Sequence, residues 1–75
     1  MSQTFTIYVE RDPETQLYVG MVPGLAGAHS QGATLDELQS NMKEVIELVL
    51  DEHKARGEPV DLAPFAGIQQ ISVTV

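Results

Sequence analysis

The sequence predicts a small α+β domain in which one long helix covers one face of a mostly antiparallel sheet, in the order β-β-β-α-β. Two observations carry this prediction. Segments near both ends alternate apolar and polar residues with the period of two that is typical of half-buried strands. A middle segment places apolar residues at helical spacing behind a capping signal. Because 75 residues suffice for only one domain, we expect a single domain over residues 1–75.

The first two expected strands form an antiparallel hairpin. Residues 4–11 alternate strictly, and residues 17–21 alternate again. Between them, Asp12 and Pro13 favour a turn, because the Asp side chain bonds to its own backbone and Pro fixes φ. The connection is short, so the two strands are expected to pair directly.

A glycine-rich segment follows the hairpin. Residues 23–32 contain three glycines and one proline, and we expect mostly turn there, with a short third strand around residues 28–31. Gly24, Gly27 and Gly32 are expected to take backbone angles that other residues avoid. They do not form a phosphate loop, because no Lys-Ser/Thr pair follows them.

The clearest element is a helix from Thr34 to about Arg56. Thr34 and Glu37 fit a capping box, in which hydroxyl and carboxylate satisfy free N–H groups at the start of a helix. Gly57 is suited to end the helix, and Pro59 is unable to continue it. The apolar stripe expected to face the core consists of Leu35, Leu38, Met42, Val45, Ile46 and Val49.

The last expected strand covers residues 68–75, with Ile71, Val73 and Val75 on one face. Phe65 or Leu62, in the connection before it, is expected to pack back on the core. A chain this short is marginally stable, and without cysteine it has no disulfide to stabilise it. We therefore expect a dimer or tetramer, with these three residues as the candidate interface.

Charge restricts the possible partners. Eleven acidic and four basic residues give a formal charge of −7. This charge argues against direct binding of nucleic acid or of anionic membranes, and it favours a basic partner. No stretch is long and apolar enough to span a membrane, and the amino terminus lacks the pattern of a signal peptide. We therefore expect a cytoplasmic protein.

The glycine-rich segment and the helix start resemble the HicB family of antitoxins, whose usual run is approximately P-D-L-P-G-C-x-S-x-G-D-T-x-E-E-A. The resemblance covers about residues 4–60. Gly24 and Ala33 stand where that family usually has acids. The matching positions are Pro23, Leu25, Gly27, Ser30, Gly32, Thr34 and Glu37, and all of them except Ser30 are expected to be structural.

The resemblance implies a partial ribonuclease-H-like fold and an oligomer. It also implies that the chain is an antitoxin that binds and occludes a small, basic, RNA-cutting toxin of the HicA type. Many HicB proteins continue into a DNA-binding domain, whereas this sequence stops at Val75 on the last expected strand. We therefore expect no DNA-binding domain, no cofactor and no catalysis.

Five residues are candidates for contact with the partner. Glu10, Asp12 and Glu14 cluster around the first turn and form an acidic edge that suits toxin Arg or Lys side chains. Tyr8 and Tyr18 are expected to be cross-strand neighbours on the face that the helix leaves open, where exposed tyrosines often anchor a partner. A solvated turn and ordinary cross-strand packing are the alternative readings.

Two other functions stay open. One is a stand-alone oligomeric module with another ligand. The other is a degenerate metal-dependent nuclease, which needs several converging carboxylates. The second and last strands supply none, and His29 and His53 lack metal-binding spacing. We therefore expect neither a metal site nor catalytic residues.

Overall fold

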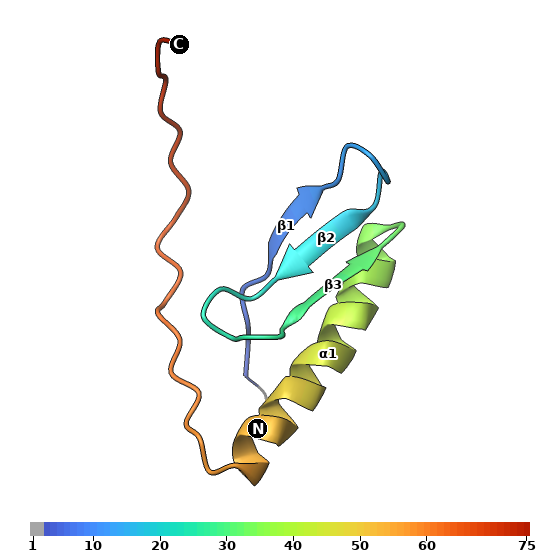
Figure 1. Ribbon diagram of the computed structural model, residues 1–75, viewed down its shortest axis with the longest axis vertical. Coiled ribbons are helices and arrows are strands. Elements are labelled where there is room, and N and C mark those ends of the chain that lie inside the picture. The colour runs from blue at the N-terminus through green and yellow to red at the C-terminus, as the bar shows by residue number, and fades with distance from the viewer. Residues whose placement is uncertain (1–2) are drawn as a thin grey trace.

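Three antiparallel strands and one long helix form the body of the molecule (Figure 1). In the computed structural model, β1 (Tyr8–Arg11), β2 (Tyr18–Met21) and β3 (His29–Gly32) lie side by side in the order β1-β2-β3. Helix α1 (Leu35–Ala55) follows directly. This arrangement confirms the predicted α+β class.

The structure describes residues 3–75. The amino terminus, where we expect no signal peptide, begins with two residues that lie outside the described part of the chain. No helix in the described part of the chain is long and apolar enough to cross a membrane.

The core lies between α1 and one face of the sheet, beneath β3 and β2. Met42, on the apolar stripe of the helix, is completely buried. Gly32 allows the close approach of sheet and helix, because a Cβ atom there would come within 2.6 Å of the backbone nitrogen of Leu38. The buried side chains are those of Val22, Leu25, Ala28, Leu38, Met42, Ile46 and Val49.

The ends of α1 are capped as the sequence predicts. The hydroxyl of Thr34 accepts a hydrogen bond from the amide of Glu37 at 3.0 Å. The Glu37 carboxylate reaches back and accepts from the amide of Ala33 at 3.3 Å. At the other end, Gly57 takes a left-handed conformation (φ 66°) and its amide donates to the carbonyl of Lys54 at 3.1 Å.

The glycine-rich segment forms the turn between β2 and β3. Gly24 and Gly27 have φ values of 86° and 87°, which only glycine adopts readily. Leu25 lies between them and is buried in the core. Gly32 does not share the left-handed conformation, so that part of the prediction is wrong. Glycine is required at position 32 because a side chain there would clash with the backbone at the start of α1.

The expected strand at residues 68–75 is not part of the sheet, so the last β of the predicted order is wrong for the single chain. After α1, Leu62 packs against the core, and the Phe65 ring meets the Tyr8 ring edge-on, with centroids 5.9 Å apart. Beyond them the chain runs extended, away from the body (Figure 1). Alternation indicates strand propensity, but it does not specify which edge the strand joins.

Candidate partner-binding surface

The face of the sheet that α1 leaves uncovered is partly apolar. Because residues opposite each other in a ladder share a face, the register Tyr8↔Met21 and Met21↔His29 places these three together, with Glu10 and Val19 beside them. We call these five residues the open face. The side chains of Tyr8, Val19 and Met21 are 46%, 37% and 46% exposed. A surface of this kind suits contact with another protein.

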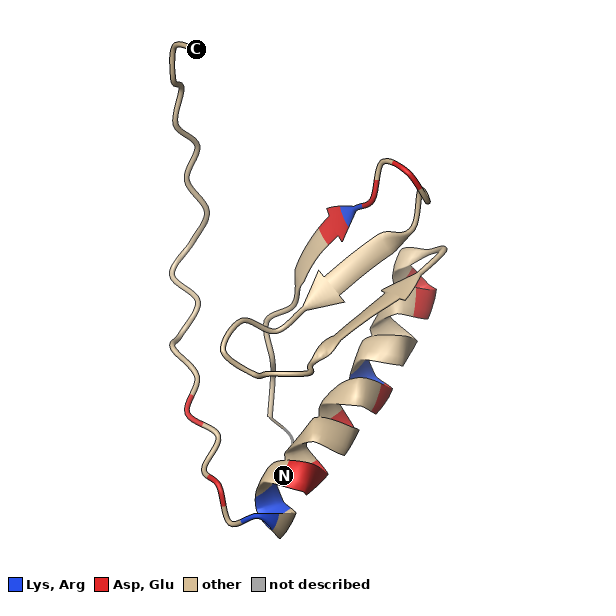
Figure 2. Ribbon diagram, viewed as in Figure 1, with Lys and Arg blue, Asp and Glu red and all other residues tan. Residues whose placement is uncertain are grey.

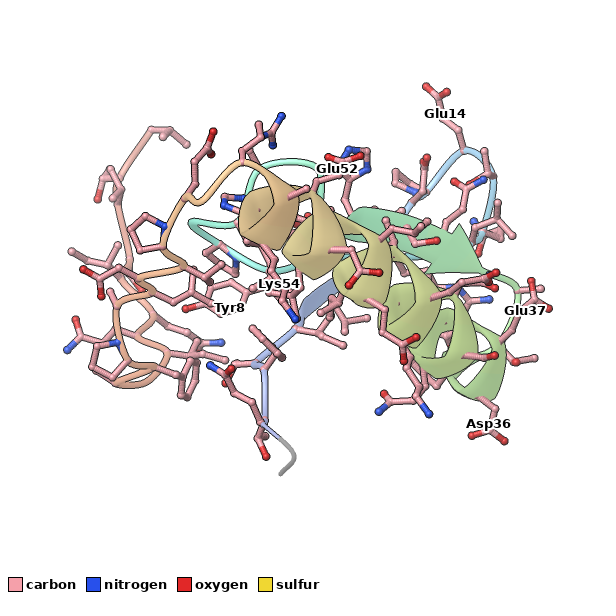
Figure 3. The ribbon with its side chains drawn as sticks, turned by 90° about the horizontal axis from the view of Figure 1, so that it is seen from below. Tyr8, Glu14, Asp36, Glu37, Glu52 and Lys54 are labelled. Atoms are coloured by element: carbon pink, nitrogen blue, oxygen red, sulfur yellow. The ribbon has the colours of Figure 1, made fainter. Side chains whose placement is uncertain are left out.

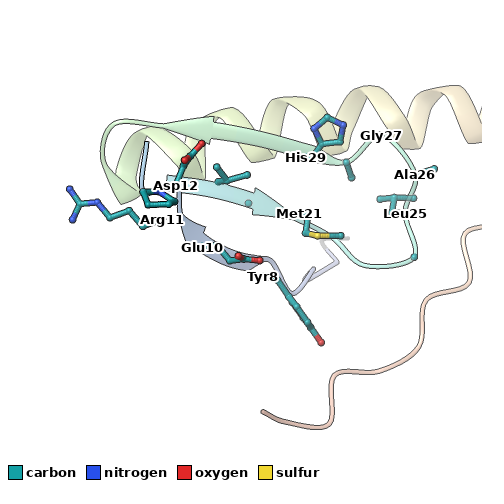
Figure 4. A pocket seen from close by; sticks show the side chains of 14 residues that line it. Tyr8, Glu10, Arg11, Asp12, Met21, Leu25, Ala26, Gly27 and His29 are labelled. Carbon is teal, nitrogen blue, oxygen red and sulfur yellow. The ribbon is translucent and has the colours of Figure 1, made fainter. Parts of the chain in front are cut away.

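The open face forms the floor of a hollow of about 780 Å³ (Figure 4). The β2–β3 turn borders it on one side, with Leu25 and Ala26, and the end of β1 borders it on another, with Glu10 and Asp12. In Figure 4 the ring of Tyr8 projects from β1 away from the helix. The hollow therefore combines an apolar floor with a carboxylate rim.

Acidic side chains gather at the β1–β2 turn. Asp12 accepts a hydrogen bond from the amide of Glu14 at 2.9 Å, which fixes the turn; Glu14 is exposed and Asp12 is half-buried. Figure 3 shows Glu14 at the same end of the molecule as Asp36 and Glu37 at the start of α1.

Within the described residues, these carboxylates take part in none of the ion pairs. The ion pairs of the described residues lie at the opposite end of α1, where Arg56 meets Glu52 at 3.9 Å and Glu58 at 3.2 Å, and where His53 lies 3.7 Å from Glu58. Arg11 lies between Glu10 and Asp12 in the sequence, and Figure 2 shows basic residues both there and at the carboxyl end of α1. The acidic residues outnumber Arg11 at the turn. Positive charge on a partner is therefore attracted to the turn.

Tyr18 does not lie on the open face. The register pairs it with Arg11, whose guanidinium carbon lies 5.2 Å from the centre of the Tyr18 ring. Tyr8 pairs instead with Met21, on the opposite face. The expectation that the two tyrosines are cross-strand neighbours is therefore wrong. Tyr18 lies opposite Arg11, three positions along β1 from Tyr8, and an odd offset places side chains on opposite faces of the sheet.

Three members of the open face, Val19, Met21 and His29, were not among the sequence candidates. Alternation in residues 17–21 marks an apolar face on the second strand, but it does not say which way that face points. The deciding residue is Gly20, where a Cβ atom would lie 3.0 Å from Ile7 and 3.2 Å from Leu38. The close approach of the helix at Gly20 turns Val19 and Met21 outward.

The described part of the chain contains no cluster of potential metal ligands. Within residues 3–75, no three His, Asp or Glu side chains lie close enough together to hold a metal ion. His29 sits on the open face, whereas His53 lies beside Glu58 at the other end of the molecule.

Comparison with known proteins identifies the family. Residues 5–72 match the family model described as the HicB-like antitoxin of bacterial toxin–antitoxin systems. A UPF0150 protein of Thermotoga maritima is 45% identical over 69 residues, which are 92% of this chain and 88% of the relative. A UPF0150 protein of Synechocystis is 44% identical over 71 residues, 95% of this chain and 96% of the relative.

A third UPF0150 protein, from Archaeoglobus fulgidus, is 42% identical over 69 residues, 92% of this chain and 93% of the relative. No solved structure matches the chain significantly, so the ribonuclease-H-like comparison stays an expectation. The family match spans all three strands and the helix. This chain belongs to the HicB-like antitoxins of bacterial toxin–antitoxin systems.

Proposed function

We propose that this chain sequesters a small, basic, RNA-cutting toxin of the HicA type in the cytoplasm, by docking it on the open face and the acidic β1–β2 turn. One observation carries the proposal: the exposed apolar floor formed by Tyr8, Val19 and Met21 adjoins the carboxylates of Glu10 and Asp12. A protein interface commonly combines such an apolar centre with a charged rim.

The two parts of the surface have different roles. The acidic turn attracts a basic toxin from a distance and speeds association, in keeping with the formal charge of −7. The apolar hollow excludes water and holds the toxin, because buried aromatic and aliphatic anchors supply most of the affinity of an interface. The toxin is inhibited because the antitoxin covers its active site, and no chemistry by the antitoxin is needed.

The partner is identified by purifying the tagged chain from its native host. We expect a stoichiometric basic chain, which cleaves RNA when separated and stops cleaving when this protein is returned. Recovery of this protein alone would contradict the proposal and favour a stand-alone module. A retained chain that lacks nuclease activity would also contradict the proposal.

The surface is tested with two variants that remove the same number of charges. The triple variant Glu10→Gln, Asp12→Asn, Glu14→Gln should weaken toxin binding by about tenfold or more, because it removes the negative charges of the turn that attract the basic toxin. The control Glu44→Gln, Asp51→Asn, Glu52→Gln neutralises three exposed acids on the outer face of α1.

We expect the control variant to lower the affinity for the toxin much less than the variant at the turn does. Calorimetry at a fixed salt concentration measures both affinities. Equal losses in both variants would show that only net charge matters and would refute the proposed surface. Independently, Tyr8→Ala should weaken binding by about tenfold, as truncation of an aromatic anchor usually does.

A further inference from the structure

The methionines of this chain differ in their exposure to solvent. The sequence contains three methionines and no cysteine, so sulfur occurs in this chain only as the thioether of methionine. Met42 is completely buried in the core, whereas the side chain of Met21 is 46% exposed. Because a dissolved oxidant reacts with the sulfur that it can reach, exposure decides which thioether is oxidised first. Within residues 3–75, that thioether belongs to Met21.

Met21 lies in the middle of the open face. In the register of the sheet it is opposite Tyr8 of β1 and opposite His29 of β3. It also lines the hollow of about 780 Å³, together with Val19 and Leu25 (Figure 4). A toxin that docks on this floor therefore covers the side chain of Met21 and removes it from water.

Oxidation changes the polarity of this floor. A peroxide transfers one oxygen atom to the sulfur, so that the O–O bond breaks, a bond between sulfur and oxygen forms, and the sulfur gives up two electrons. Hydrogen peroxide is reduced to one molecule of water in the same step. The product, methionine sulfoxide, carries an oxygen that accepts hydrogen bonds. Burying this oxygen against an apolar partner costs free energy, because it loses its bonds to water.

We propose that Met21 is an oxidation site that controls toxin binding: a peroxide converts its thioether to the sulfoxide, and the modified open face binds the toxin less tightly. This inference rests on the proposed function, because it needs the toxin on the open face. Oxidation acts on antitoxin that is free of toxin, since bound toxin shields the sulfur. The modification is reversible, because methionine sulfoxide reductases restore the thioether.

The fold itself should survive this modification. Met21 is not among the buried side chains of the core, and it is the neighbouring Gly20 that the helix approaches closely. The buried Met42 stays out of reach of the oxidant. Circular dichroism should therefore show the same helicity before and after treatment with peroxide. A loss of binding then reports on the surface and not on unfolding.

The selectivity of oxidation is measured first, on the purified full chain without toxin. The folded protein is treated with hydrogen peroxide, and the oxygen gained by each methionine is located by mass spectrometry of peptides. We expect sulfoxide at Met21 well before any at Met42. In urea the two residues should react at similar rates, which controls for their intrinsic reactivity. Equal rates in the folded protein would overturn the proposal.

Toxin binding is measured next, with the basic chain recovered from the native host and with the peroxide removed before mixing. The oxidised antitoxin should bind this toxin about tenfold more weakly than the untreated protein does, because the change lies at the centre of the interface. Treatment with methionine sulfoxide reductases should restore the affinity. If the untreated chain does not bind the recovered toxin, the proposed function fails, and this inference with it. If treated and untreated chains bind equally tightly, the oxidation site alone fails.

Two matched variants assign the effect to one sulfur. Met21→Leu removes the exposed thioether but keeps an apolar side chain of similar volume, and Met42→Leu does the same in the core. Each variant is compared with itself before and after treatment with peroxide. The affinity of Met42→Leu for the toxin should fall as it does in the unmodified chain, whereas that of Met21→Leu should not change on treatment. A peroxide effect that persists in Met21→Leu would refute the proposal.

The complex provides a test that needs no variant. Bound toxin should slow the oxidation of Met21, because it covers the hollow. Oxidation of Met21 at the same rate with and without saturating toxin would place this residue outside the interface and overturn the inference.

Discussion

At the scale of single residues, Gly32 is the position where the fold tolerates least change. A Cβ atom there would come within 2.6 Å of the Leu38 nitrogen and 3.0 Å of the Glu37 carbonyl carbon, both backbone atoms that are unable to move aside. We expect Gly32→Ala to lower the free energy of unfolding by about 3 kcal/mol, measured by urea denaturation.

Gly57→Ala is the control for that substitution. Gly57 has a left-handed backbone, but nothing lies within 4 Å of its added Cβ atom, so only conformational strain of about 1 kcal/mol is expected. If Gly32→Ala were no more destabilising than Gly57→Ala, the close contact between β3 and the start of α1 would be wrong.

Thr34 tests the start of the helix in the same way. Its hydroxyl accepts from the amide of Glu37, so Thr34→Ala should cost about 1 kcal/mol of stability. Thr34→Ser keeps an oxygen in place and should recover most of that loss. Thermal unfolding of the three proteins side by side measures both effects. Equal losses for Ala and Ser would mean that the methyl group, and not the hydrogen bond, matters.

At the scale of elements, the two sides of α1 should respond very differently to truncation. Met42 is fully buried, and Met42→Ala should lower the free energy of unfolding by about 3 kcal/mol through lost packing and a cavity. Leu48 lies on the outer side and is 60% exposed, so Leu48→Ala should change stability by less than about 0.5 kcal/mol. A large effect at Leu48 in urea denaturation would reveal that this face of the helix is buried in an oligomer.

The elements also show how far sequence reasoning reaches. The helix, its caps and the first hairpin follow from local signals, such as Thr34 and Glu37 three residues apart, and they were predicted correctly. Which face of a strand is buried is not a local property: Val19 and Met21 point outward because Gly20 meets the helix. The alternation of residues 68–75 predicts a strand, but its neighbour is set by tertiary or quaternary structure.

At the scale of the whole molecule, the proposed toxin contact and the expected oligomer contact use different parts of the chain. The toxin is placed on the open face and the acidic turn, whereas the oligomer interface is expected at Ile71, Val73 and Val75, which lie outside the sheet of the single chain. Because these positions do not coincide, we expect dimerisation to leave the toxin surface free. One dimer then presents two such surfaces, and the proposed antitoxin and the expected dimer are tested separately.

The final prediction concerns the stability of the whole molecule. If two copies bury Ile71, Val73 and Val75 between them, folding and association are linked, and the melting temperature rises with protein concentration. Each tenfold increase in concentration is worth about 1.4 kcal/mol per mole of dimer, which for about 150 residues corresponds to about 4 °C. Differential scanning calorimetry over two decades of concentration measures this slope. The variant Ile71→Glu, Val73→Glu should melt at a lower temperature that does not depend on concentration, because its single chain keeps the core around Met42 but loses the contact between copies. A concentration-independent melting temperature for the unmodified chain would show that association does not stabilise it and would contradict the expected dimer.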